Sequence, residues 1–276
     1  MADQIIPIIK QSQPVSTSVT AKPSQAVETI SLPSKGYFYP ETHPLASGVV
    51  DIYQVTARHE DILSNTNFLK KGIVLDEFLK AIIATPNVSL NDFLIGDKNA
   101  LFIAARRSAY GDVYNTKVKC PECGVETQVS VDLGKLGIKD IDYSSLPKGA
   151  NKLSFTLPVS GKTVVCSVLT HKNDADIDQE IKLLSKMVTG STPPEVTTRL
   201  KYTIQSVDGD ADRAKINKFV DEELTAKESL ALRTFVREKT PDVDMTFDFV
   251  CPECGHQARM SIPLGTTFFW PSVSDK

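Results

Sequence analysis

Apolar residues recur every three or four positions in several stretches of the chain, which predicts amphipathic helices there. Predicted helices begin after Thr56, near Asp76, after Asp97, at about residue 174 and after Thr225. Thr56 is a suitable N-cap, and Thr225 with Glu228 forms a T-x-x-E capping box. The pattern therefore predicts helices spread over most of the chain.

Alternation of apolar and polar residues predicts strands elsewhere. Residues 49–55 predict a short strand, and residues 152–157 and 162–169 predict a hairpin that turns at Ser160-Gly161. Residues 242–250 alternate strictly, with one face made of Val243, Met245, Phe247 and Phe249. Helices and hairpins in this order predict an α+β fold.

One pentapeptide occurs twice. Cys120-Pro121-Glu122-Cys123-Gly124 returns as Cys251-Pro252-Glu253-Cys254-Gly255, an offset of 251 − 120 = 131 residues. The flanks match at the same offset, so that Val118 corresponds to Phe249 and Val129 to Met260. Each copy predicts a strand, a C-x-x-C turn and a second strand. We call the C-x-x-C turn a knuckle.

Four thiolates from two knuckles suit one tetrahedral zinc ion, with Zn–S distances of about 2.3 Å and no open coordination position. We therefore predict a structural Zn²⁺ held by Cys120, Cys123, Cys251 and Cys254. The full prediction is an α+β fold in which two zinc-ribbon-like β-knuckle hairpins share this ion. The predicted fold also contains flanking helices and an added β-hairpin segment.

Other chemistry for the cysteines and histidines has less support. A redox dithiol needs a single C-x-x-C at a helix N-terminus, whereas both motifs here lie between predicted strands; an iron–sulfur cluster is a further alternative. We expect His256 to be a surface residue, and Cys166, in an apolar run, to be a core thiol. His171 alone does not make Cys166 a nucleophile, and the sequence contains no G-x-S-x-G or phosphate-binding loop.

Composition narrows the class of protein. The chain has 276 residues, of which 24% are charged and 41% hydrophobic, as in ordinary globular proteins. Its net charge of −3 offers no field that would attract nucleic acid. There is no apolar run long enough to span a membrane and no signal-peptide pattern at the N-terminus. Because four of its five cysteines fall in C-x-x-C pairs, we expect metal binding in a reducing cytoplasm.

Domain organisation is predicted from the same patterns. Residues 1–31 are polar and predict a flexible N-terminal arm. We expect residues 32–270 to form a single zinc-stapled domain with an inserted segment at about 140–220. Residues 271–276 would be a C-terminal tail.

Four segments together carry a family resemblance. They are LPSKGYFYP at 32–40, VTARHEDIL at 55–63, LIGDKNALFIAARRSAYG at 94–111 and VKCPECG at 118–124. In this order they resemble the baseplate hub and hub assembly proteins of T-even-like contractile-tailed bacteriophages. The resemblance covers roughly residues 32–135 and resumes over 224–265.

This resemblance implies a non-enzymatic structural or assembly protein of the phage tail baseplate, in its hub region. Its partners would be other baseplate and hub proteins, and it would be found in the virion tail baseplate or in the host cytoplasm during assembly. The alternatives are a zinc-ribbon nucleic-acid-binding regulator and a thiol–disulfide assembly chaperone. Phe268, Phe269 and Trp270 are either interface anchors or ordinary packing residues.

Overall fold

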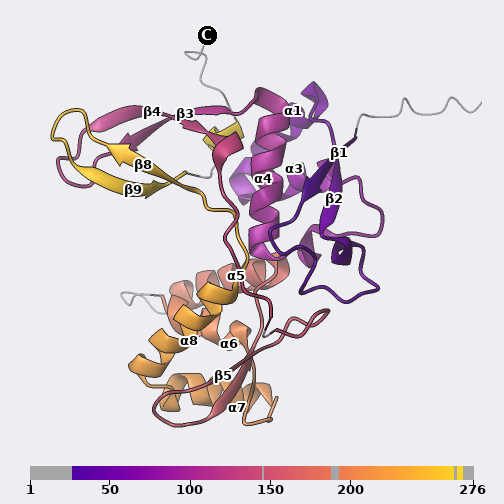
Figure 1. Ribbon diagram of the computed structural model, residues 1–276, viewed down its shortest axis with the longest axis vertical. Coiled ribbons are helices and arrows are strands. Elements are labelled where there is room, and N and C mark those ends of the chain that lie inside the picture. Colours follow the sequence, from indigo (N-terminus) through magenta and orange to yellow (C-terminus); the bar gives the residue numbers. More distant parts are fainter. Residues whose placement is uncertain (1–26, 145, 188–192, 264–265, 270–276) are drawn as a thin grey trace, which may run out of the picture.

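Helices and antiparallel strands follow one another along the chain, in agreement with a mixed α and β fold. The computed structural model describes residues 27–144, 146–187, 193–263 and 266–269. Figure 1 shows its elements in two groups along the long axis. The upper lobe contains β1–β4, α1–α4, β8 and β9, and the lower lobe contains β5–β7 and α5–α8.

The upper lobe begins with a two-stranded sheet. Strand β1 (Val27–Ser31) pairs antiparallel with β2 (Val49–Tyr53), which the sequence predicts. β1 is mostly exposed and lies at the end of the segment 1–31 that the sequence predicts to be a flexible arm, where it is paired with β2. Backbone pairing, which polar composition does not reveal, orders this strand. Residues 1–26 lie outside the described residues.

Three short helices follow β2. They are α1 (Ala57–Leu63), α2 (Thr66–Lys71) and α3 (Val74–Ile82). Thr56 is the N-cap of α1, as predicted, and its N–H donates to Nδ1 of His59 at 3.0 Å. The helix predicted near Asp76 is α3, whose buried face packs into the core of the lobe.

Helix α4 (Ile95–Tyr110) is buried along most of its length. In its first turn the carboxylate of Asp97 is fully buried and accepts hydrogen bonds from the backbone N–H and the hydroxyl of Ser34, at 2.9 and 2.7 Å. The Tyr39 hydroxyl donates to the same carboxylate at 2.7 Å and accepts from the N–H of Leu94 at 2.9 Å. These bonds tie the aromatic loop at 32–40 to α4.

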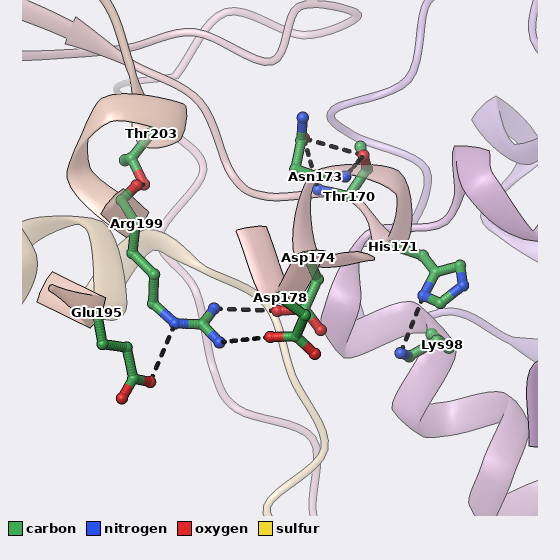
Figure 2. A network of polar contacts seen from close by, with 9 residues as sticks. All are labelled: Lys98, Thr170, His171, Asn173, Asp174, Asp178, Glu195, Arg199 and Thr203. Atoms are coloured by element: carbon green, nitrogen blue, oxygen red, sulfur yellow. Dashed lines mark hydrogen bonds and ion pairs between the residues drawn. The ribbon is translucent and has the colours of Figure 1, made fainter. Parts of the chain in front are cut away.

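A polar cluster connects α4 to the first helix of the lower lobe, α5 (His171–Met187). Figure 2 shows Lys98 of α4 facing the His171 ring, with 3.1 Å between Nζ and Nδ1. The other ring nitrogen, Nε2, lies 3.3 Å from the carboxylate of Asp76 on α3. The structure thus occupies both ring nitrogens of His171 with protein partners.

Two connecting segments, around residues 137–139 and 242–244, run side by side between the lobes. The N–H of Lys139 donates to the carbonyl of Asp242 at 2.9 Å, and the N–H of Asp244 donates to the carbonyl of Gly137 at 2.8 Å. Val243 pairs only with Ile138, in an isolated bridge. The strand predicted over 242–250 is therefore regular only in its second half.

The lower lobe contains a three-stranded sheet. Its strands are β5 (Leu153–Thr156), β6 (Thr163–Cys166) and β7 (Ile204–Val207), and β6 lies in the centre. The predicted hairpin is formed by β5 and β6, and Gly161 in its turn has a φ of +69°. The short strand β7 gives no clear sequence signal.

Helices cover this sheet. Besides α5, they are α6 (Glu195–Thr203), α7 (Arg213–Lys218) with a following π-helical turn, and α8 (Ala226–Lys239). The capping box of Thr225 and Glu228 is present at the start of α8. The ring of Phe235 on α8 stacks on Phe155 of β5, with 4.7 Å between centroids.

The C-terminal segment returns to the upper lobe. Phe268 and Phe269 are each 1% exposed, so ordinary packing is the right interpretation for these two residues. The Phe269 ring lies 4.8 Å from that of Phe78, and Arg106 Nε donates to the carbonyl of Phe268 at 2.9 Å. Trp270 lies outside the described residues.

One continuous cluster of buried side chains runs through both lobes, so they share a core. No helix among the described residues is long and apolar enough to cross a lipid bilayer.

Candidate metal centre

The two C-x-x-C motifs lie in two hairpins that project together from the upper lobe (Figure 1). The hairpins are formed by β3 (Val113–Lys119) with β4 (Glu126–Asp132), and by β8 (Thr246–Val250) with β9 (Gln257–Ser261). Each motif occupies the turn of its hairpin. The metal-ligand prediction thus concerns two turns that the fold brings to the same place.

The internal repeat seen in the sequence is also a repeat in structure. Thr116 pairs with Val129 in the first hairpin, and Phe247 pairs with Met260 in the second. Both members of the second pair lie 131 positions after those of the first, since 247 − 116 = 131 and 260 − 129 = 131. The two hairpins therefore have the same strand register.

The two turns share their backbone hydrogen bonds as well. The N–H of Cys120 donates to the carbonyl of Val125 at 2.9 Å, and the N–H of Cys251 donates to that of His256 at 2.9 Å. Gly124 has a φ of +75° in one turn and Gly255 a φ of +71° in the other. Glycine adopts this left-handed conformation without the penalty of a Cβ, which explains its place after each motif.

The four sulfur atoms converge. Sγ of Cys120 lies 3.8 Å from that of Cys254, and Sγ of Cys123 lies 3.7 Å from that of Cys251. All four lie within 4.8 Å of one another. A tetrahedron with Zn–S bonds of about 2.3 Å has edges of about 3.8 Å. The sulfur positions therefore fit the corners of a tetrahedral thiolate site.

The same distances argue against disulfide bonds. A disulfide requires about 2.05 Å between sulfurs, and all five cysteines are free thiols. The short distances also join one hairpin to the other. The arrangement brings thiols of both hairpins to one place, where they could hold a metal ion together.

Burial divides the four cysteines into two kinds. Cys120 and Cys251 are 2% and 1% exposed and pack with Val118 and Phe249 in a small apolar cluster separate from the main core. Cys123 and Cys254 are exposed. One side of the site is thus supported by apolar packing, and the other is open to solvent.

The electrostatics of the cluster favour a bound cation. Backbone hydrogen bonds, first from Cys123 and then from Glu122, outweigh desolvation and lower the pKa of Cys120 to about 6. The backbone N–H of His256 lowers the pKa of Cys254, but desolvation and the neighbouring sulfurs outweigh it and raise that pKa to about 12. One thiolate forms readily and then opposes ionisation of its neighbours. A divalent cation would remove this conflict.

The remaining candidates lie elsewhere. His256 contributes backbone groups to its turn, and its ring is not a member of the four-thiol group. Cys166 is fully buried in the sheet of the lower lobe, and burial raises its pKa to about 12, as expected for a core thiol. His171 contacts Lys98 and Asp76 instead of a cysteine.

Sequence reasoning missed the buried Asp97 network behind the 32–40 loop. The only local signal for Asp97 is its place in the first turn of a helix, where a carboxylate is favoured by the helix dipole.

Comparison with known protein families gives a match over residues 39–270, most of the chain, to the family described as T4 bacteriophage base plate protein. No curated protein matches the chain, and no solved structure matches it.

Proposed function

The chain belongs to the T4 bacteriophage base plate protein family, and we propose that it is a scaffold of the baseplate hub that acts by protein–protein contacts. Family membership makes it a structural protein of a T4-like phage baseplate and puts it in the virion tail, with other phage tail proteins as partners. The hub location and the contact mechanism are proposed here. We also propose that the chain is present in the host cytoplasm while baseplates are being assembled.

The proposed cofactor is one structural Zn²⁺ held by Cys120, Cys123, Cys251 and Cys254. The observation that carries it is the pair of 3.8 and 3.7 Å sulfur distances between the two hairpins, which suit a tetrahedral ion. Four thiolates would complete the shell and leave no position for a substrate. Such an ion supports a scaffold and offers no catalytic site.

A zinc ion there would connect segments that are far apart in sequence. Structural zinc binding contributes roughly 10 kcal/mol or more to the fold that assembles the site. In sequence, the hairpin β3–β4 precedes the lower lobe and the hairpin β8–β9 follows it. The free energy of zinc binding would hold these two hairpins together. Both hairpins would then project as one rigid unit suited to contact.

For domain organisation we propose a single zinc-stapled domain in which the lower lobe is the inserted segment. The common core of the two lobes supports one domain. The insertion would be longer than the expected 140–220, because α8 packs on β5. Residues 153–239 are its proposed extent.

The two alternatives explain fewer observations. For a nucleic-acid-binding regulator, the net charge of −3 supplies no electrostatic attraction. For a thiol–disulfide chaperone, the close sulfurs should belong to one C-x-x-C motif, whereas the close pairs here join different hairpins. Salt-dependent DNA retention would favour the first, and a measurable redox potential in zinc-replete protein the second.

Metal analysis of the full-length chain, purified under reducing conditions, tests the zinc proposal. We expect one zinc per chain, measured by native mass spectrometry and elemental analysis. Cys120→Ser should lower the zinc content well below one, and Cys166→Ala, which alters the fifth cysteine, should leave it at one. Metal-free wild-type protein, or unchanged zinc in Cys120→Ser, would refute the site.

Complementation tests the role. In cells infected with phage lacking this chain, the wild-type protein and Cys166→Ala should restore baseplates. Cys120→Ser should not restore them, because its hairpins would no longer be held together. Baseplates that form normally without the chain would contradict the scaffold proposal.

A further inference from the structure

Residues of α6 and α8 line a groove in the lower lobe. Figure 1 shows these two helices well away from the hairpins that carry the cysteines. The volume of the groove is about 460 Å³. We call it the α6–α8 groove. Its apolar floor is Leu169, Val196, Leu200 and Val236, and its rim carries the ion pair of Glu195 with Arg199 on α6 and the two arginines Arg233 and Arg237 on α8. A floor of this kind can receive an apolar side chain from another molecule.

Within the described residues, the charges of the two α8 arginines on the rim are not neutralised, whereas that of Arg199 is. Arg199, which also borders the groove, lies 3.0 Å from Asp174, 4.0 Å from Asp178 and 3.5 Å from Glu195, as Figure 2 shows. Among the described residues no carboxylate pairs with Arg233 or Arg237. Arg233 instead donates Nε–H to the carbonyl of Ser229 at 3.3 Å. The rim therefore has two cations available to an external partner.

Apolar surface extends from the groove onto the faces of both helices. Val196 is 46% exposed, and Leu230 on α8 is 58% exposed. Leu230 precedes Arg233 by three positions and Arg237 by seven, so these three residues lie on one face of α8. Exposed apolar side chains thus lie in the groove and on the α8 face that carries the two arginines, a combination typical of protein–protein interfaces.

We propose that the α6–α8 groove docks an acidic amphipathic segment of another baseplate protein. An apolar side chain of that segment packs on Val196 and Leu230, and its carboxylates pair with Arg233 and Arg237. The inference rests on the proposed scaffold function and names one contact surface for it. The two arginines favour an acidic partner by charge complementarity. The apolar floor favours a protein over a nucleic acid, because the phosphates of a nucleic acid would contact the arginines and make no use of the floor.

Site-specific photo-crosslinking tests the proposal in infected cells that make the full-length chain. A benzophenone amino acid replaces Val196 in one variant and Leu183 in its control. Leu183 lies on α5 outside the groove and is similarly exposed, at 52%. We expect the Val196 position to label an acidic segment of another baseplate protein, identified by mass spectrometry of the crosslinked peptides.

Charge reversal then tests the rim. Adding Arg233→Glu or Arg237→Glu should lower the crosslinking yield at position 196 by about tenfold, because like charges would meet at the contact. Lys227→Glu is the matched control, since it reverses an exposed charge of α8 outside the groove and should leave the yield unchanged. An unaltered yield in both arginine variants would contradict the proposal.

The outcomes also separate this inference from the proposed function. Baseplates that contain the chain, with position 196 labelling no more than position 183, would overturn the groove and leave the scaffold role intact. Labelling of DNA, of a second copy of this chain or of a segment without carboxylates would overturn the groove as well. A chain absent from baseplates would contradict the scaffold role and with it this inference.

Discussion

The hydroxyl of Tyr39 makes two buried hydrogen bonds, and Tyr39→Phe would remove both. The hydroxyl donates to Asp97 at 2.7 Å and accepts from the N–H of Leu94 at 2.9 Å. A hydrogen bond to a charged group contributes about 1.5–3 kcal/mol, and a buried N–H left without an acceptor costs about 1–3 kcal/mol. We expect the free energy of unfolding to fall by roughly 3–5 kcal/mol, since these contributions are not fully additive.

The same substitution should change the pH dependence of stability. Desolvation raises the pKa of Asp97 above its ordinary value of 3.8, and hydrogen bonds from Tyr39 and Ser34 oppose that rise. Without the Tyr39 donor the pKa of Asp97 in the folded state should rise further. A carboxyl with a raised folded-state pKa stabilises the fold fully below its unfolded-state pKa and loses that contribution as the pH rises. Tyr39→Phe should therefore be more destabilising at pH 7 than at pH 4.5.

Urea unfolding of the full chain, followed by circular dichroism at both pH values, measures the two effects. Tyr53→Phe is the matched control, because this half-buried tyrosine of β2 makes no hydrogen bond through its hydroxyl in the described part of the chain. It should change stability by less than about 0.5 kcal/mol. A loss below about 1 kcal/mol for Tyr39→Phe, or an equal loss at both pH values, would refute the reasoning.

Two further predictions concern packing and capping. Phe269→Ala should lower the free energy of unfolding by about 3–5 kcal/mol in urea titrations, because the ring is 1% exposed and packs on Phe78; Val250→Ala, at a position 59% exposed, is the control, and equal effects would contradict the packing. Desolvation raises the pKa of Glu228, but hydrogen bonds from Ser160 and Thr225 outweigh it and lower that pKa from 4.5 to about 2. The stability that Glu228 contributes should be present above pH 4.5 and lost as the pH falls towards 2, so Glu228→Gln should flatten the stability curve there, and an unchanged slope would argue against it.

The sequence predicts the knuckles well because their chemistry is local. A C-x-x-C turn followed by glycine determines its own backbone hydrogen bonds, and two copies with equal flanks predict the same register twice. Helices with a cap were predictable for the same reason. Thr56 and Thr225 each mark a helix start that the structure contains.

The rest depends on contacts between residues distant in sequence. Strand β1 is ordered by pairing with β2, and its own residues are too polar to indicate burial. Phe268 and Phe269 follow the second hairpin by only a few residues, yet they reach the core beside α4 through the return of the chain. Which arginines of the groove rim are paired with carboxylates likewise cannot be predicted from the sequence. That Arg199 is neutralised and Arg233 is not depends on how α5 and α6 pack together.

Why the hairpins should need a metal follows from their size. Each has two strands, and an isolated two-stranded hairpin is marginally stable in water. Their joint apolar cluster is small: Val118 and Phe249 are buried beside Cys120 and Cys251, and the half-buried Val129, Phe247 and Met260 pack against them. Apolar burial on this scale cannot fix the angle between two projecting hairpins, whereas a shared ion can, because each thiolate constrains the other three. With the proposed ion bound, the rigidity of the projecting unit would depend on the four sulfurs, whereas the stability of the lobes depends on the core.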